Sequence, residues 1–114
     1  MAHAEWIPHT REDGERVGWM LPRGEGFIVI DLLGRERTGI LDWFAAEEYA
    51  EALGIGFLAD IHLFTLPDGR ELRVRIAEVS PSNVRVKEDD GGAVGAPQIY
   101  YDLGFPAPET LRPL

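Results

Sequence analysis

The sequence predicts an α+β fold that is mainly β, with an antiparallel sheet of about five to seven strands, twisted or partly closed into a small open barrel, and one helix near residues 43–53. Two Asp-Gly pairs predict the sheet, because each stands between alternating apolar runs, the strongest short-range hairpin signal. Apolar residues at helical spacing predict the helix. With 114 residues the chain is expected to form a single domain, 1–114.

The first hairpin is expected over residues 5–21, around Asp13-Gly14. A two-residue turn at this pair sets Pro8 opposite Trp19. Because proline has no N–H to donate to a strand ladder, the strand that contains Pro8 is expected at a sheet edge.

Three segments follow the first hairpin. Residues 21–26 indicate a loop by their glycine and proline content, and the nearly continuous apolar run 26–33 is typical of a strand covered on both faces. The polar residues 34–39 indicate a turn or a short strand.

The helix has both a start and a stop signal. Asp42 is a favoured N-cap residue and Gly54 stands where helices commonly end, so the helix is expected to span 43–53. Its apolar stripe consists of Trp43, Ala46, Ala50 and Leu53. We expect this stripe to pack on the sheet with Trp43 buried, while the three helix glutamates, Glu47, Glu48 and Glu51, face elsewhere.

A meander is expected over residues 57–87, with two strands around the second Asp-Gly pair and a third strand at 84–87. Residues 88–97 indicate a loop, and 98–103 a last strand. The tail, 105–114, is too rich in proline to be regular and is expected to run extended. Its apolar residues, which can hold it against the body, are Phe105, Leu111 and Leu114.

The register of the first two meander strands decides which side chains share a face, because a slip of one residue turns every side chain over. Setting apolar residues opposite each other places Leu66 opposite Glu71. This register gathers four basic side chains on one face, here called the basic strip: Arg73, Arg75, Arg85 and Lys87. Phe64 and Leu58 are expected beside the strip.

The basic strip and Phe64 indicate a non-catalytic binding or protein-interaction module. Guanidinium groups favour two-point contacts with carboxylates, so the expected partner is an acidic protein or a small carboxylate ligand. The helix glutamates of a second copy fit the same description, which would make the protein a homodimer.

His62 and Asp60 offer an alternative, a small acid–base enzyme in a half-open barrel. Residues two apart on a strand project from one face about 7 Å apart, and a carboxylate can orient a histidine that acts near neutral pH. A third interpretation, oligonucleotide binding, uses Phe64 among the arginines. A deep pocket around His62 would favour the enzyme, and a flat face would favour the module.

The charge and composition exclude several classes of partner. A net charge of −9 and a pI near 4.7 argue against binding to nucleic acid or to an anionic membrane. The one match to a dinucleotide fingerprint, at 54–59, follows a helix instead of preceding it, and paired metal-ligand spacings are absent. Since the N-terminal residues lack the basic and apolar regions of a signal peptide, we expect a cytoplasmic protein without cofactor or metal.

Overall fold

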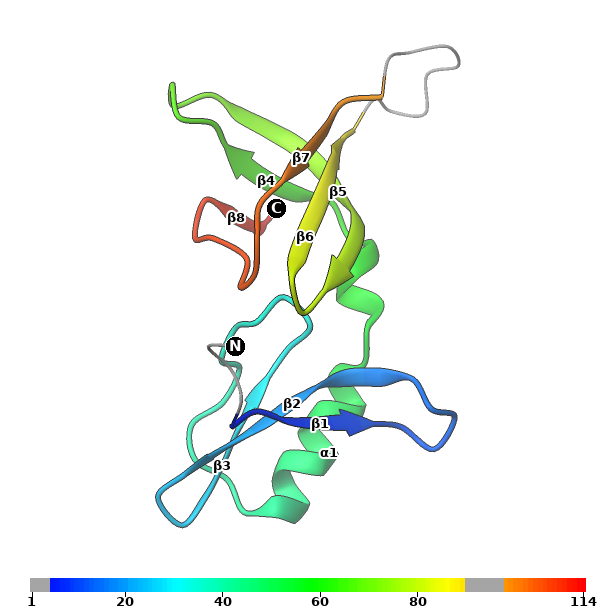
Figure 1. The fold of residues 1–114 in the computed structure, drawn as a ribbon, viewed down its shortest axis with the longest axis vertical. Coiled ribbons are helices and arrows are strands. Elements are labelled where there is room, and N and C mark those ends of the chain that lie inside the picture. Colours follow the sequence, from blue (N-terminus) through cyan, green and yellow to red (C-terminus); the bar gives the residue numbers. More distant parts are fainter. Residues whose placement is uncertain (1–4, 90–97) are drawn as a thin grey trace. The chain divides into compact units, whose positions relative to one another are not determined.

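The computed structural model describes residues 5–89 and 98–114, and its internal contacts divide the chain into two compact units, Met1–Ile55 and Gly56–Leu114 (Figure 1). The single domain, 1–114, that the sequence suggested stays a prediction. The predicted class is confirmed, since the described residues form an α+β fold that is mainly β. The strands are divided between two antiparallel sheets, of three and five strands, and neither sheet closes into a barrel. Each unit has its own sheet and is described by itself.

The sheet of the first unit has the order β1-β2-β3, with β1 at Ile7–Thr10, β2 at Arg16–Arg23 and β3 at Gly26–Ile30. Pro8 lies opposite Trp19 and its strand is an edge strand, as predicted, but Arg11 and Glu15 enclose a three-residue loop in place of the expected two-residue turn. This position is compatible with proline, because the outer side of an edge strand needs no donor for a ladder.

The second hairpin of this sheet is tighter than predicted. Pairing of β2 with β3 continues until Arg23 lies opposite Gly26, so the expected loop over 21–26 is wrong and only Gly24 and Glu25 form the turn. After β3 the chain turns back and runs beside this strand. It forms two isolated β-bridges with β3, one of which joins Phe27 to Leu41. This close return explains Gly26, because a side chain there would collide with the carbonyl oxygen of Leu41.

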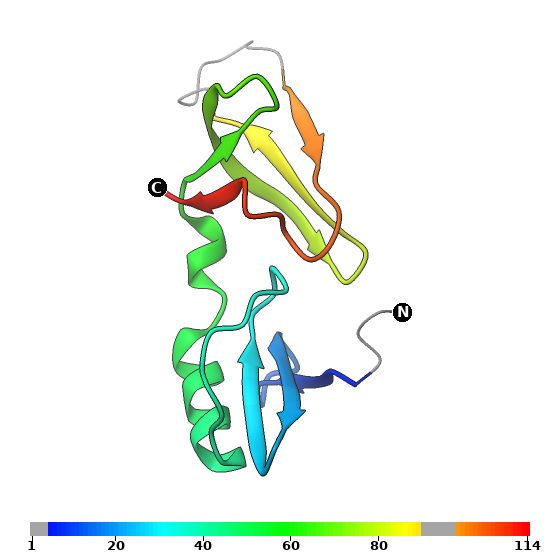
Figure 2. The same cartoon turned by 90° about the vertical axis from the view of Figure 1, so that its left-hand side faces the viewer.

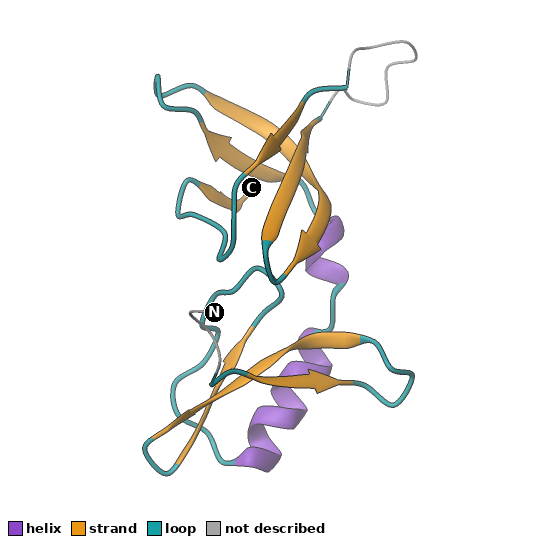
Figure 3. Ribbon diagram, viewed as in Figure 1, coloured by secondary structure: helices purple, strands orange, loops and turns teal. Residues whose placement is uncertain are grey.

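Helix α1 spans Trp43–Leu53, as predicted, and lies along one face of the three-stranded sheet (Figures 2 and 3). Asp42 caps its first turn, since the carboxylate accepts a hydrogen bond of 2.8 Å from the backbone N–H of Ala45. Gly54 ends the helix with a positive φ of 59° and donates its N–H to Ala50. Between the helix and the sheet lies a cluster of buried residues, Val17, Met20, Val29, Ala46 and Ala50.

Trp43 is not buried, contrary to the prediction. Its exposed fraction is 38%, and its ring makes a T-shaped contact with that of Phe27, with the ring centres 5.0 Å apart. The helix approaches the sheet through Ala46 and Ala50, which are small enough for close packing, and the large ring at the first turn remains beside this contact.

The second unit begins with a short 3-10 helix, η1 at Gly56–Ala59, where the sequence predicted the start of a strand. Its sheet has the order β7-β6-β5-β4-β8. The strands are β4 at His62–Thr65, β5 at Glu71–Ser80, β6 at Asn83–Glu88, β7 at Tyr100–Asp102 and β8 at Leu111–Pro113. The predicted loop at 88–97 lies mostly outside the described residues.

The proline-rich tail is more regular than predicted, because its end forms β8 and pairs with β4. Leu111 lies opposite Phe64 and is fully buried. Leu114, by contrast, has an exposed fraction of 62%. The tail therefore contributes a core residue to the second unit, although only part of it packs.

The predicted register of the second Asp-Gly hairpin is wrong by one residue. Leu66 donates its N–H to the carbonyl of Arg70 and accepts from the N–H of Gly69, whose φ is +91°. These two bonds enclose a three-residue loop, a type I turn followed by a glycine bulge, in place of the expected two-residue turn. Leu66 consequently faces Arg70 and not Glu71.

This one-residue difference changes which side chains reach the core. His62 now lies opposite Val74, and both are buried together with Phe64. Arg73 lies opposite Leu63, on the other face of the sheet, here called the outward face. Phe64 and the arginines are therefore on opposite faces, contrary to the prediction.

Candidate functional site

The four residues of the basic strip share one face of the second unit's sheet, as predicted, although the register of β4 with β5 differs from the predicted one. Arg75 lies directly opposite Lys87, and each has a second strip residue two positions before it on the same strand, Arg73 on β5 and Arg85 on β6. Arg112 joins this outward face, because it lies opposite Leu63. Five of the six basic residues in Gly56–Leu114 thus share one face.

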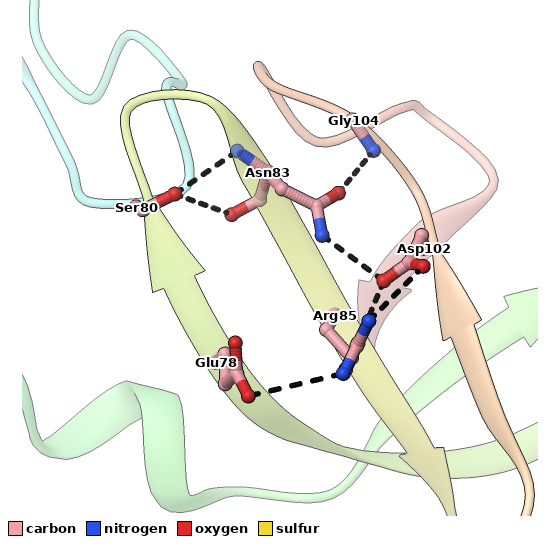
Figure 4. Close-up of polar contacts among 6 residues, drawn as sticks. All are labelled: Glu78, Ser80, Asn83, Arg85, Asp102 and Gly104. Carbon is pink, nitrogen blue, oxygen red and sulfur yellow. Dashed lines mark hydrogen bonds and ion pairs between the residues drawn. The ribbon is translucent and has the colours of Figure 1, made fainter.

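Arg85 belongs to a polar network that joins β6 to β7 (Figure 4). Its guanidinium donates to both carboxylate oxygens of Asp102, at 2.7 and 3.3 Å. Asn83 donates to the same carboxylate at 3.0 Å, and its own side-chain oxygen accepts from the N–H of Gly104 at 2.9 Å. Glu78 lies at 3.9 Å on the other side of Arg85. These contacts give Arg85 a structural role.

The same network shifts the titration of both partners. The hydrogen bond from Arg85, followed by that from Asn83, holds the pKa of the Asp102 carboxyl below its ordinary value. The reciprocal hydrogen bond to Asp102 raises the pKa of Arg85. Because the Asp102 pKa is lower in the folded state, the stabilisation from this carboxylate is present above its ordinary pKa. It is lost as pH falls through the folded value.

We expect a carbon-detected carboxyl titration by NMR to give Asp102 a pKa below that of an ordinary aspartate. In Arg85→Gln this pKa should rise toward the ordinary value, because the largest cause of the shift is gone. Arg75→Gln is the matched control, since Arg75 contacts Asp89 and not Asp102. An unchanged Asp102 pKa in Arg85→Gln would contradict the network.

Two further cations of the outward face are also held by neighbours. Arg75 donates to the carboxylate of Asp89 at 3.3 Å and to the carbonyl of Ala59 at 3.4 Å. Arg112 donates to the hydroxyl of Thr65 at 3.0 Å and pairs with Glu71. The Arg112–Glu71 pair is exposed, and exposed ion pairs contribute only about 0–1 kcal/mol to stability, whereas the side chain of Asp89 is only 14% exposed.

Arg73 and Lys87 are different, because within residues 5–89 and 98–114 neither side chain has a hydrogen bond or an ion pair. Arg73 is exposed and Lys87 is half-buried. Tyr100 lies opposite Lys87, has an exposed fraction of 47%, and stands 5.8 Å from the Arg85 guanidinium. Unpaired cations beside an exposed aromatic ring can bind an anionic group and an apolar group together.

Both residues that were expected beside the strip lie elsewhere. Phe64 is 8% exposed and packs in the core against Tyr101, with the ring centres 5.4 Å apart. Leu58 belongs to η1 and not to a strand. Their places beside the cations are taken by Leu63 and Tyr100, whose positions depend on the registers of β4 and β7.

The structure does not bring His62 and Asp60 together as an acid–base pair. His62 is 2% exposed, and its ring Nδ1 lies 2.9 Å from the backbone carbonyl oxygen of Asp60. A carbonyl can only accept, so Nδ1 is protonated and donates. The Asp60 carboxylate therefore does not orient the ring through this bond, and the ring faces the core instead of a substrate.

A second group of polar side chains lies in the first unit, where the sequence predicted no metal site. Nε2 of His9 is 3.3 Å from a carboxylate oxygen of Glu51, and Glu47 lies one helical turn earlier. The ligand atoms of all three lie within 4.8 Å of one another. The four-residue spacing of the two glutamates is visible in the sequence, but the histidine reaches them only through the fold.

No model of a known protein family matches the chain, and no curated protein or solved structure is significantly similar to it. Among the described residues, no helix has the length and apolar character needed to cross a lipid bilayer.

Proposed function

We propose that the second unit is a non-catalytic binding module that holds an acidic peptide segment of a partner protein on its outward face. One observation carries this proposal, the unpaired cations of Arg73 and Lys87 within the described residues. Three further cations, Arg75, Arg85 and Arg112, lie on the same face, and each is paired with a neighbouring carboxylate.

The spacing of these cations suits an extended peptide. Arg73 and Arg75 project from one strand two residues apart, about 7 Å along its axis. Acidic side chains two apart in an extended peptide have the same separation. Arginine offers a planar fork of donors to each carboxylate, whereas Lys87 offers a point charge beside the Tyr100 ring.

The charge of the whole protein opposes this interaction at long range. With a net charge of −9, the protein repels an acidic partner until the two surfaces are close, so association is expected to be slow and affinity modest. At contact the attraction is local, between exposed groups, and is screened within about 10 Å at ordinary ionic strength.

The acid–base enzyme has weaker support, because His62 is buried and its ring is bonded to a backbone carbonyl. A second copy of this protein is another candidate acidic partner, since Glu47, Glu48 and Glu51 all lie on α1. Sedimentation of the protein alone separates this homodimer from capture of a different acidic protein.

The test is a charge reversal of the two unpaired cations, Arg73→Glu with Lys87→Glu. Binding of a labelled hexaglutamate peptide at low salt should weaken about tenfold or more, since two attractions become repulsions of similar size. The control is Arg23→Glu with Arg70→Glu, which changes the net charge equally at two exposed positions off this face. Equal loss in both variants would reduce the effect to overall charge and contradict the proposed site.

A further inference from the structure

His9 is a buried histidine on an edge strand of the first unit. Its exposed fraction is 7%, and it lies opposite Gly18 of β2. Its ring is nearly perpendicular to that of Trp43, with the ring centres 6.3 Å apart. The imidazole is thus held between strand β1 and helix α1, with Nε2 directed toward the helix carboxylates.

The helix supplies two carboxylates to the same place. Glu47 and Glu51 are four residues apart, so they lie on one side of α1. Glu47 is half-buried and Glu51 is exposed. The opening at Glu51 gives an ion and its water ligands access from solvent.

We propose that His9, Glu47 and Glu51 bind a divalent transition-metal ion, for which Zn²⁺ is the best match, with water completing the coordination. A neutral imidazole with two carboxylates neutralises a charge of +2. Imidazole favours zinc and its neighbours over calcium or magnesium, which prefer oxygen alone. Three protein ligands with an open position is an established arrangement for zinc.

The geometry is close to what zinc needs. With bonds of about 2.0–2.2 Å, the ligand atoms of a tetrahedral site lie about 3.3 Å apart. The His9 and Glu51 atoms already have this separation, at 3.3 Å. Glu47 has to approach from within 4.8 Å, which a rotation of its half-buried side chain can supply.

The competing account is a simple ion pair between a protonated His9 and Glu51. That pair gives Glu47 no role, whereas a metal site requires it. A metal would also join the edge strand β1 to α1 directly, so binding should stabilise the first unit.

The test is a titration of the intact protein with Zn²⁺, followed by calorimetry and by thermal unfolding. Wild-type protein should bind one ion, and saturation should raise the unfolding midpoint by about 5 °C or more. Substitution with Co²⁺ should give visible absorption and quench Trp43, which is beside His9.

Glu47→Gln and Glu51→Gln should each weaken zinc binding about tenfold or more, with circular dichroism unchanged. Glu48→Gln is the matched control, because it removes the same charge from the same helix outside the cluster and should bind as wild type. Absence of zinc binding by the wild type overturns the proposal and leaves an ion pair only. Equal binding by all three variants also overturns it, because the ion would then lie elsewhere.

Discussion

Replacing Asp31 by alanine is expected to lower the free energy of unfolding by about 3–5 kcal/mol. The carboxylate of Asp31 is fully buried at the end of β3. One of its oxygens accepts from the backbone N–H groups of Leu33 and Arg35, at 2.9 and 3.1 Å, and the other is 3.3 Å from Arg37. Alanine leaves these donors without the carboxylate in a buried site.

Asp13→Ala is the matched control for Asp31→Ala. Asp13 also accepts from a backbone N–H, that of Glu15 at 3.0 Å, in a loop of the same type, but it is exposed. Its loss should cost about 1 kcal/mol or less, because water replaces the carboxylate. Urea unfolding measures both effects. Similar midpoints for the two variants would contradict the claim that burial of Asp31 makes its hydrogen bonds costly to remove.

Leu111→Ala is expected to cost about 2–5 kcal/mol, as truncations of buried leucines do. Leu111 is fully buried in the tail strand β8, opposite Phe64, so the change leaves a cavity in the core of the second unit. The cost should appear as a lower urea midpoint and as faster hydrogen exchange in β4.

Leu114→Ala is the matched control, because it truncates a leucine of the same tail without leaving a cavity in the core. Leu114 is 62% exposed, so its truncation should change stability by no more than about 0.5 kcal/mol. If Leu111→Ala were equally mild, the tail would not be part of the folded core.

The helix and the hairpins could be predicted because their signals are local. Asp42 and Gly54 fix the ends of α1 through their own hydrogen bonds and backbone angles. The glycines of the two Asp-Gly pairs adopt positive φ angles of 86° and 91°, which allow the chain to reverse. Each of these features depends on a few adjacent residues.

The register of the second hairpin could not be predicted in the same way, because an Asp-Gly pair is compatible with loops of different length. Both hairpins use a three-residue loop in which the aspartate accepts from a backbone N–H two positions later, as Asp68 does from Arg70. The extra residue turned His62 and Phe64 inward. Strand β8 was missed because its pairing with β4 is non-local.

The basic strip could be predicted in part, since alternation along β5 and along β6 holds in either register. Its neighbours could not, because Tyr100 and Asp102 reach the cations through the pairing of β7. The cluster around His9 required the packing of α1 on the first sheet. Sequence patterns therefore predicted which side chains of a single strand share a face. The residues that these side chains contact depend on the pairing of strands that are distant in the sequence.

The most direct test of the binding proposal is an NMR titration of labelled protein with hexaglutamate, observing backbone amides and the arginine side chains. The proposal predicts that the largest shift changes map to the outward face, at Arg73, Arg75, Lys87 and Tyr100, and diminish as salt increases. Shift changes elsewhere, or no saturable change at low salt, would contradict an acidic peptide site on this face.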